Sequence, residues 1–349
     1  MISKANQISN GVKLMVITQR VDVNDNNLGF FHHWLEKLAE KAKELRVICL
    51  FEGEHHLPRN TIVYSLGKER GYSKLRQFFR LQKFFLKNLP KVDGVLVHMC
   101  PIYALAGFPL VKIFRKRFIM FYAHGAVHWK LRAAEKMVDL ILTSSSAGCR
   151  LNSKKIRIIG QGIDVELFKS AERKYSEDFK ILYAGRLNPT KDTEVIIKAV
   201  NILNNKKIKL RIVGYPLVKS EKEYLQKLKN SVKNFSLESQ VEFINGALYS
   251  QMPRHYQEAD LFVNPSSTGS LDKAVLEAMA SGCLVLTCND AYRDILADKY
   301  LFEKGNADDL VQKITNLMGQ GKDPSLREIV VKNHNLENLI DKIIARFYE

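Results

Sequence analysis

The chain has 349 residues, of which 46% are hydrophobic, and it carries a formal net charge of +17. This length accommodates two domains, the apolar content is too high for a largely disordered protein, and no apolar run approaches the roughly 20 residues of a membrane span. The N-terminus lacks the apolar core of a secretory signal, and the five cysteines are scattered without a Cys-x-x-Cys pair. We therefore expect a reducing, cytoplasmic location and no structural metal.

The positive charge is concentrated in the first half of the chain. Residues 1–170 hold 28 Lys and Arg against 13 Asp and Glu, a net of +15, whereas residues 171–349 hold 26 against 24, a net of +2. Residues 68–91 alone contain eight basic side chains and one acidic side chain. Such a field attracts polyanions or an anionic membrane.

Short apolar runs alternate with longer segments of helical periodicity along the first half. This alternation is typical of a parallel sheet that is covered by helices on both faces. The predicted buried strands are 12–18, 45–51, 94–99, 117–124, 139–145 and 155–161, and the predicted helices lie near 30–43, 74–89 and 104–115.

The pattern stops at the polar segment 170–178 and then restarts. We therefore predict an α/β protein with two doubly wound, Rossmann-like domains, 1–170 and 171–335, and a C-terminal amphipathic helix, 336–349, that can pack back on the first domain. Two such domains face each other across a cleft, and their ligands bind at the carboxyl ends of the strands, often with phosphate on a helix N-terminus. The strands predicted in the second half are 179–185, 210–215, 241–247, 260–265 and 284–288.

Two cations follow the first strand of the second half. Arg186 and Lys191 stand between the strand "FKILYAG" and a predicted helix, "EVIIKAVNIL". Two cations at the mouth of a cleft suit a diphosphate, although on spacing alone a pair of solvated charges is the simpler interpretation.

A cluster of small and polar residues, 267–273, precedes the apolar helix that contains Glu277. Ser270 is a candidate N-cap, Gly269 allows a tight turn, and backbone amides there would receive a phosphate or sugar hydroxyls. Glu277, one turn further on, could bind two neighbouring hydroxyls of a ribose. The alternative is an i,i+4 pair with Lys273, in the weaker orientation.

Several of these segments together resemble one enzyme family. "YAGRLNPTKDTEVIIKAVNIL", "LRIVGY", "VEFINGAL", "YQEADLFVNPSS" and "VLEAMASGCLVLT" are similar, in order and spacing, to the retaining GT-B-fold glycosyltransferases of the large family four. In the first half "HMCPIY", "FYAHG", "DLILTSS" and "IGQGIDVELF" resemble the family more weakly. The resemblance implies a nucleotide-diphosphate sugar donor in the second domain and an acceptor in the first. It places Arg186 and Lys191 on the diphosphate, Glu277 on the donor ribose and His124 near the reacting sugar.

The chain departs from the pattern of that family at two places. The first Glu of the Glu-x7-Glu motif falls at Gly269, and Asp272 stands where the family usually has Gly, so we expect Asp272 or Ser270 to take over contacts with the donor sugar. The usual Gly-Gly turn after the first strand is missing, and Gly29 is the one glycine in "QRVDVNDNNLGFF". The expected donor-binding residues are Gly29, Gly185, Arg186, Lys191, Gly214, Gly246, Ser270, Leu271, Lys273 and Glu277, with His124 and Asp272 as catalytic candidates.

The resemblance implies transfer of a sugar, with retention, to a glycan or a lipid-linked acceptor in cell-surface polysaccharide or glycolipid assembly. In the expected mechanism the acceptor attacks the sugar from the face that the nucleotide leaves, and the leaving phosphate helps to take the acceptor proton. Arg186, Lys191 and helix-end amides would stabilise the negative charge that develops on this phosphate. No Asp-x-Asp occurs in the chain, so we expect a metal-independent enzyme without a cofactor, since the nucleotide-sugar is a substrate.

Two other classes of protein are compatible with parts of the sequence. A catalytically silent GT-B partner protein is suggested by Gly269, and a nucleic-acid-binding protein is suggested by the basic first half. No helix-turn-helix, RNP or zinc signature accompanies the charge, so we expect no nucleic-acid partner.

The basic helix predicted at 74–89 indicates a location at a membrane surface. We expect its apolar stripe to pack on the first sheet, which leaves Arg80, Lys83, Phe84 and Lys87 to face an anionic bilayer. The protein is therefore expected to be peripheral on the inner face of the plasma membrane. The residues of the predicted stripe are Leu75, Phe78, Phe79, Gln82, Phe85, Leu86 and Leu89.

Overall fold

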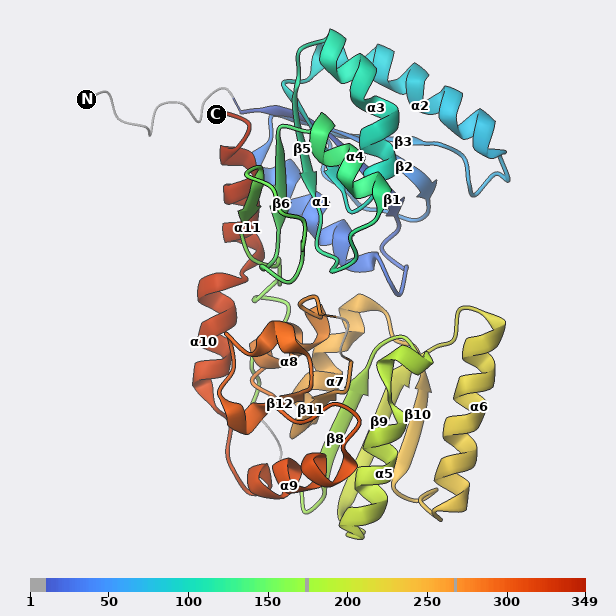
Figure 1. The fold of residues 1–349 in the computed structure, drawn as a ribbon, viewed down its shortest axis with the longest axis vertical. Helices are drawn as coiled ribbons and strands as arrows, with labels where there is room; N and C mark the ends of the chain where they lie inside the picture. The colour runs from blue at the N-terminus through green and yellow to red at the C-terminus, as the bar shows by residue number, and fades with distance from the viewer. Residues whose placement is uncertain (1–10, 173–175, 267–268) are drawn as a thin grey trace, which may run out of the picture. The chain divides into compact units, whose positions relative to one another are not determined.

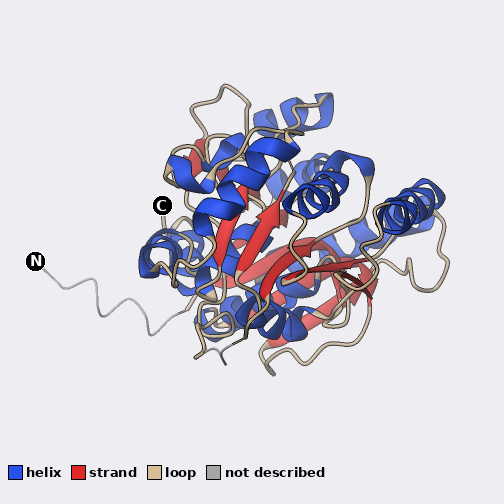
Figure 2. Cartoon of the chain, turned by 90° about the horizontal axis from the view of Figure 1, so that it is seen from below, coloured by secondary structure: helices blue, strands red, loops and turns tan. Residues whose placement is uncertain are grey.

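The computed structural model describes residues 11–172, 176–266 and 269–349 and divides the chain into two compact units. Unit 1 contains the chain up to Gly162 together with Leu336–Glu349, and unit 2 is Ile163–Asn335. Each unit has one parallel sheet with helices packed against it (Figures 1 and 2), which confirms the predicted α/β class. Residues 173–175 of the predicted linker and 267–268 of the polar cluster lie outside the described residues.

The sheet of unit 1 has seven strands in the order β3-β2-β1-β4-β5-β6-β7. Strand β3 was not predicted, because it is an edge strand with mostly half-buried residues and therefore lacks a strong apolar run. The strand order reverses between β1 and β4, so the carboxyl ends of these two strands form the ligand-binding edge expected of such a sheet. The strands are Lys13–Val21 (β1), Glu44–Glu52 (β2), Thr61–Ser65 (β3), Gly94–His98 (β4), Arg117–Phe121 (β5), Leu140–Thr143 (β6) and Ile156–Ile158 (β7).

Helices cover both faces of this sheet. The two helices α1 (Gly29–Lys41) and α11 (Leu336–Ala345) pack together on one face, where Leu339, Ile340 and Trp34 belong to one buried core. The C-terminal helix therefore completes unit 1. The other face is covered by α2 (Lys74–Asn88), α3 (Pro101–Ile113) and α4 (Trp129–Met137).

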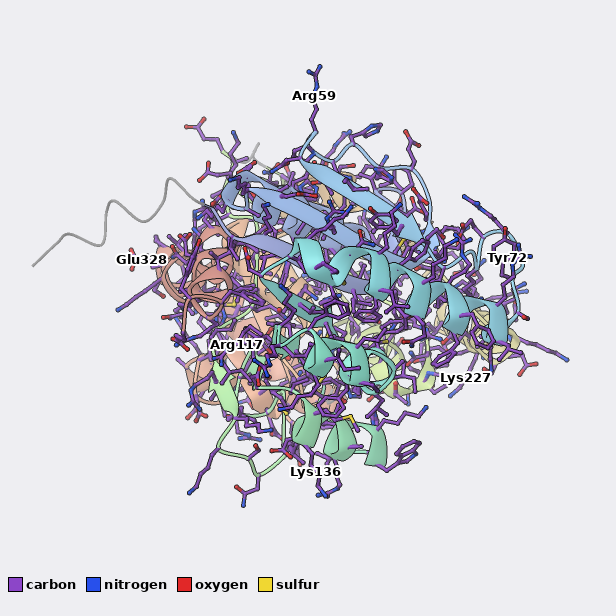
Figure 3. All side chains as sticks on the ribbon, turned by 90° about the horizontal axis from the view of Figure 1, so that it is seen from above. Arg59, Tyr72, Arg117, Lys136, Lys227 and Glu328 are labelled. Carbon is purple, nitrogen blue, oxygen red and sulfur yellow. The ribbon has the colours of Figure 1, made fainter. Side chains whose placement is uncertain are left out.

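Helix α2 packs differently from the prediction. Leu75, Phe78, Phe79 and Leu86, which were expected to face the sheet, are between 45% and 66% exposed. The buried residues of the helix are Leu81, Phe85 and Asn88, and its first half projects beyond the body of unit 1 (Figure 1). Tyr72 marks the loop at this projecting end in Figure 3.

Two of the side chains expected to face a bilayer are instead turned towards the unit. Phe84 is half-buried and packs against Tyr64, with 5.1 Å between the ring centroids. Arg80 donates a 2.8 Å hydrogen bond from Nη2 to the carbonyl of Ser65. The apolar residues of α2 are spread around much of the helix. Only one narrow face of the helix packs on unit 1, so the apolar residues on its other faces stay exposed.

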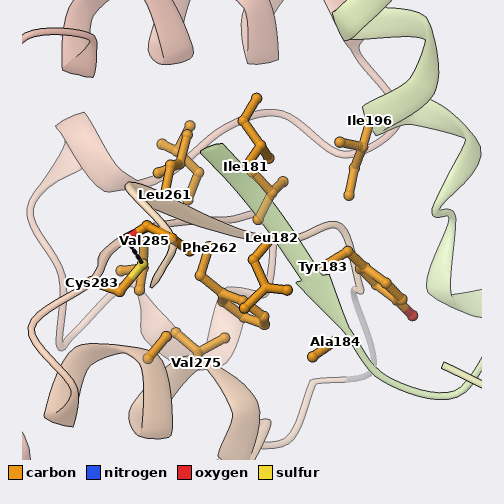
Figure 4. Packing of buried hydrophobic residues seen from close by; sticks show 14 of the residues in the cluster. Ile181, Leu182, Tyr183, Ala184, Ile196, Leu261, Phe262, Val275, Cys283 and Val285 are labelled. Atoms are coloured by element: carbon orange, nitrogen blue, oxygen red, sulfur yellow. Dashed lines mark hydrogen bonds between the residues drawn. The ribbon is translucent and has the colours of Figure 1, made fainter. Parts of the chain in front are cut away.

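The sheet of unit 2 has five strands in the order β10-β9-β8-β11-β12, and the order reverses between β8 and β11. Its core joins Leu182 of β8 to Phe262 of β11 and Val275 of α8, all fully or almost fully buried (Figure 4). The strands are Phe179–Ala184 (β8), Ile208–Gly214 (β9), Val241–Asn245 (β10), Leu261–Asn264 (β11) and Leu284–Thr287 (β12). The helices are Glu194–Leu203 (α5), Lys219–Asn234 (α6), Met252–Glu258 (α7), Lys273–Ala280 (α8), Ala307–Leu317 (α9) and Pro324–Asn333 (α10).

The boundary between the units falls after Gly162 rather than in the polar stretch 170–178. Ile163 joins unit 2 through a parallel β-bridge, and Phe168 is fully buried in the core of that unit. Arg327 of α10 holds the same segment by donating a 2.8 Å hydrogen bond to the carbonyl of Phe168. The described residues of the polar stretch, 170–172 and 176–178, therefore belong to unit 2.

Candidate active site at the carboxyl edge of unit 2

Polar side chains gather where strands β8 and β11 end. Arg186 and Lys191 follow β8, and Ser266 and Asp272 follow β11. At such a reversal of strand order the connections leave in opposite directions, and ligands of parallel sheets bind in the resulting crevice. The structure thus brings the predicted diphosphate pair and the predicted sugar-binding carboxylate to one edge of one sheet.

Lys191 lies at the centre of this edge. Its Nζ donates to Ser266 Oγ at 3.0 Å and to the two carboxylate oxygens of Asp272 at 3.2 and 3.3 Å. Asn264 Nδ2 donates to the same carboxylate at 3.1 Å, and Tyr292 OH donates to the Asp272 carbonyl at 2.6 Å. The side chains of Lys191 and Asp272 remain about one-fifth exposed, so a ligand can reach this ion pair.

Arg186 is paired with a different carboxylate. Its Nε lies 2.7 Å from Glu221 Oε1, in the first turn of α6, and its carbonyl accepts a 3.0 Å hydrogen bond from the hydroxyl of Tyr183. The side chain of Arg186 is 46% exposed, whereas that of Glu221 is 5% exposed. The guanidinium is therefore held on one side and open to solvent on the other.

The predicted glycines stand at the ends of three neighbouring strands. Gly185 follows β8, Gly214 ends β9 and Gly246 follows β10. A Cβ on Gly214 would lie 2.2 Å from the carbonyl oxygen of Gly185, so glycine is required for these two strand ends to approach each other. This close approach fixes the position of the backbone that leads into Arg186.

Helix α8 begins differently from the prediction. Its N-cap is Asp272 and not Ser270, and the Asp272 side chain makes no capping hydrogen bond because it is engaged by Lys191 and Asn264. Gly269 has φ +70°, which agrees with the predicted tight turn. The carbonyl of Ser270 accepts a hydrogen bond from Asn289, and the side chain of Leu271 is buried in the core.

Glu277 lies in α8 and is almost fully buried. Its Oε2 accepts a 3.0 Å hydrogen bond from the hydroxyl of Tyr256 in α7. Burial raises the pKa of Glu277 to about 7, against the opposing effects of the Tyr256 hydrogen bond and the positive charge of Lys273. Burial also lowers the pKa of Lys273 to about 8. The carboxylate therefore changes charge near neutral pH.

The remaining predicted site residues, Gly29 and His124, belong to unit 1. Gly29 is the first residue of α1. His124 is exposed in the loop after β5, where its Nδ1 accepts a 3.1 Å hydrogen bond from the backbone of Ala126. His128 has a structural role, because its Nδ1 accepts the N-capping hydrogen bond of α4.

Several polar residues of the two sheet edges were not predicted from the sequence. In unit 2, Ser266 accepts a hydrogen bond from Lys191, Glu221 pairs with Arg186, and Asn264 donates to Asp272. In unit 1, His98 ends β4, stacks on Phe31 with 3.7 Å between ring centroids and lies 3.2 Å from Thr18 of β1. The available signal was a polar residue directly after an apolar run, as in "DLFVNPSS" and "GVLVHM".

A hollow of about 250 Å³ lies at the other end of the unit 2 sheet, beside the first residues of β8, β9 and β10. Its Arg211 is already engaged by two carboxylates of the same lining, Glu242 at 2.9 Å and Glu258 at 2.8 Å. We therefore place the candidate active site at the carboxyl edge and not in this hollow.

In the part of the chain that the structure describes, no three His, Cys, Asp or Glu side chains are grouped so that they could hold a metal ion. Among the same residues, no helix combines the length and the apolar character needed to cross a membrane.

Comparisons with known proteins concern the family and the fold of the chain. Residues 164–336 match the family described as glycosyl transferases group 1. Over 298 residues the chain is 25% identical to an uncharacterized glycosyltransferase of Methanocaldococcus jannaschii, which covers 74% of this chain and 72% of the relative. It is 26% identical over 216 residues to the lipopolysaccharide 1,2-N-acetylglucosaminetransferase of Salmonella typhimurium, covering 55% of this chain and 56% of that protein.

Solved structures show the same fold. Anabaena HepE in complex with UDP and glucose matches with a TM-score of 0.77 and 15% identity over 97% of this chain and 99% of its own. Sucrose-phosphate synthase from Thermosynechococcus elongatus matches with a TM-score of 0.75 and 15% identity, covering 96% and 98%. At these identities the likeness concerns the fold, which is GT-B. The chain therefore has the GT-B fold of glycosyltransferases, and its second half, residues 164–336, matches the glycosyl transferases group 1 family.

Proposed function

We propose that the enzyme moves a sugar, with retention, from a nucleotide-diphosphate sugar to a glycan or lipid-linked acceptor in cell-surface polysaccharide or glycolipid assembly. The main support is the sheet edge where Arg186 and Lys191 follow β8 and where Asp272, after β11, accepts hydrogen bonds from Lys191. The Anabaena protein of the same fold is described with UDP and glucose, and the Salmonella relative is named for work on lipopolysaccharide.

In this proposal each side chain has a separate task. Arg186 and Lys191 bind the diphosphate, Glu277 binds the ribose hydroxyls, and Asp272 accepts hydrogen bonds from the donor sugar in place of the carboxylate missing at Gly269. As the bond between the sugar carbon and the phosphate oxygen breaks, the acceptor oxygen bonds to that carbon on the same face. The acceptor proton passes to the leaving phosphate, whose charge Arg186 and Lys191 stabilise without a metal.

Transfer assays with UDP-sugars and GDP-sugars test this proposal. Arg186→Ala and Lys191→Ala each remove a charge-assisted hydrogen bond worth about 1.5–3 kcal/mol. We therefore expect donor use to fall roughly 10- to 150-fold in each variant. Lys198→Ala is the matched control, because Lys198 is an exposed lysine of α5 in the same unit. Transfer at the wild-type rate by both variants would show that these residues do not bind the donor.

We also propose that unit 1 attaches to the anionic inner leaflet of the plasma membrane through the projecting half of α2. Leu75 is 66% exposed, Phe78 45% and Phe79 61%, and the exposed cations Lys74 and Arg76 lie among them. Exposed aromatic and aliphatic side chains beside cations suit the interface of an anionic bilayer, where each cation contributes about 1 kcal/mol. Such attachment would bring a lipid-linked acceptor to the enzyme.

Co-sedimentation with phosphatidylcholine vesicles, with and without phosphatidylglycerol, tests the attachment. We expect binding only to the anionic vesicles, weaker binding at high salt, and loss of binding in Phe78→Ser/Phe79→Ser and in Lys74→Glu/Arg76→Glu. Ile113→Ser is the control, because Ile113 is an apolar residue that is 70% exposed at the end of a different helix, α3. Binding that is absent, or that ignores salt and these variants, would favour a soluble acceptor.

A further inference from the structure

We propose that Glu221 is a positioning residue, which holds the guanidinium of Arg186 in the orientation that receives the diphosphate. This inference rests on the proposed role of Arg186 in donor binding. Glu221 is 4% exposed and lies in the first turn of α6.

The Glu221 carboxylate joins two loops of the sheet edge. Its Oε1 lies 2.7 Å from Arg186 Nε, in the loop after β8. Its Oε2 accepts a 2.7 Å hydrogen bond from the backbone N–H of Leu217, in the loop after β9. Both carboxylate oxygens are therefore used, and a buried carboxylate with two such partners has a single stable orientation.

This contact leaves the other edge of the guanidinium for a ligand. Arg186 has five N–H groups in one plane, and the Nε–H faces Glu221, so the Nη groups extend beyond that contact. The backbone at Arg186 is also held, because its carbonyl accepts from the buried hydroxyl of Tyr183. An arginine fixed at both ends loses little conformational entropy when it binds a phosphate.

The second ion pair of the edge differs from this one. Asp272, the partner of Lys191, is partly exposed and belongs to the ligand-binding edge itself. Glu221 lies behind Arg186 and is covered by protein. We therefore expect the contact between Glu221 and Arg186 to persist when a diphosphate binds, and Glu221 to act without touching the substrate.

A double-mutant cycle on UDP and inorganic pyrophosphate binding, measured by calorimetry, tests this role. Glu221→Gln keeps the shape of the side chain but cannot accept from both Arg186 and Leu217. We expect it to weaken both ligands on the order of 10-fold, which corresponds to about 1.4 kcal/mol, and to raise the donor KM with little change in kcat. In the Arg186→Ala background, Glu221→Gln should cause no further weakening. Glu223→Gln, an exposed residue of the same helix, is the matched control.

The possible results separate the alternatives. Weakening by Glu221→Gln that is equal in both backgrounds, or absent in the wild-type background, would overturn the inference. If the variant does not fold, Glu221→Asp replaces it, since the shorter carboxylate keeps the charge but misplaces Arg186. Diphosphate binding that depends on Glu221 through Arg186 supports the inference even when no sugar transfer is found, a result that would refute only the proposed function. A wild-type protein that binds neither ligand refutes both.

Discussion

Asp272 and Glu277 belong to one helix start but have different surroundings. Asp272 is partly exposed beside Lys191, whereas Glu277 is buried and accepts a hydrogen bond from Tyr256. In the proposed function the exposed carboxylate of Asp272 contacts the donor sugar. The buried carboxylate of Glu277 binds the ribose of the nucleotide. Their substitution should therefore affect different parts of the donor.

We predict that Asp272→Ala lowers turnover with the preferred donor sugar while the affinity for the free nucleoside diphosphate stays nearly unchanged. Glu277→Ala should weaken the nucleoside diphosphate itself, by about 1.5–3 kcal/mol for a lost charged hydrogen bond. Calorimetry with UDP and GDP measures the difference. Equal losses of nucleotide affinity in the two variants would contradict the division of roles.

The buried position of Glu277 predicts a dependence of stability on pH. Because its pKa rises from the usual 4.5 to about 7 in the folded protein, the folded state binds its proton more tightly than the unfolded state. The free energy of unfolding should therefore decrease from about pH 4.5 to about pH 7 in the wild type, relative to Glu277→Gln. Urea unfolding of both proteins at several pH values below 8 measures this difference. A difference that does not change with pH would show that the carboxylate is not protonated in the fold.

The ends of β8 and β9 form one rigid support for Arg186. Gly214 lies so close to the carbonyl of Gly185 that an added Cβ must displace backbone. Arg186 follows directly, so a shift of this backbone also moves the guanidinium away from Glu221. The glycines of this edge thus affect ligand binding through the position of the strand ends.

We predict that Gly214→Ala destabilises unit 2 by about 1–3 kcal/mol, as expected for an overpacked contact, and also weakens UDP binding. Gly321→Ala is the control, because no atom lies within 4 Å of the added Cβ at that position. Chemical denaturation and UDP titration of the two variants provide the measurement. Equal stability of the two variants would contradict the close packing of the strand ends.

The chain leaves unit 1 after Gly162 and returns to it at Leu336. Helix α11 contributes Leu339, Ile340 and Ile343 to the core that also contains Trp34. The stability of unit 1 therefore depends on residues from both ends of the chain, whereas unit 2 is one continuous segment.

We predict that Leu339→Ala destabilises unit 1 by about 2–5 kcal/mol and leaves unit 2 unchanged. Hydrogen exchange read by mass spectrometry should increase in peptides from β1 and α1 but not in those from β8 and β9. Leu326→Ala, in the core of unit 2, should give the opposite pattern. Increased exchange in both units after Leu339→Ala would show that the two units unfold together.

The alternation of strands and helices, the two parallel sheets and the position of Arg186 and Lys191 after a strand were all predictable from the sequence. These features depend on local apolar periodicity and on the rule that parallel strands present their carboxyl ends at one edge. The glycine at position 269 with its positive φ was predictable for the same reason, because a turn requirement is local.

The ion pairs of the candidate site, the unit boundary and the buried faces of the helices depend instead on contacts between residues that are distant in the sequence. Lys191 meets Asp272 across 81 positions of the sequence, Glu221 meets Arg186 between two loops, and α11 returns to unit 1. Helix α2 also exposes apolar residues that its periodicity suggested were buried, because burial depends on which neighbours cover the helix and not on its own pattern. Local periodicity depends on neighbouring residues and can therefore be recognised in the sequence. The tertiary structure alone determines the ion pairs, the unit boundary and the helix faces that are buried, because these features depend on segments that are remote in the sequence.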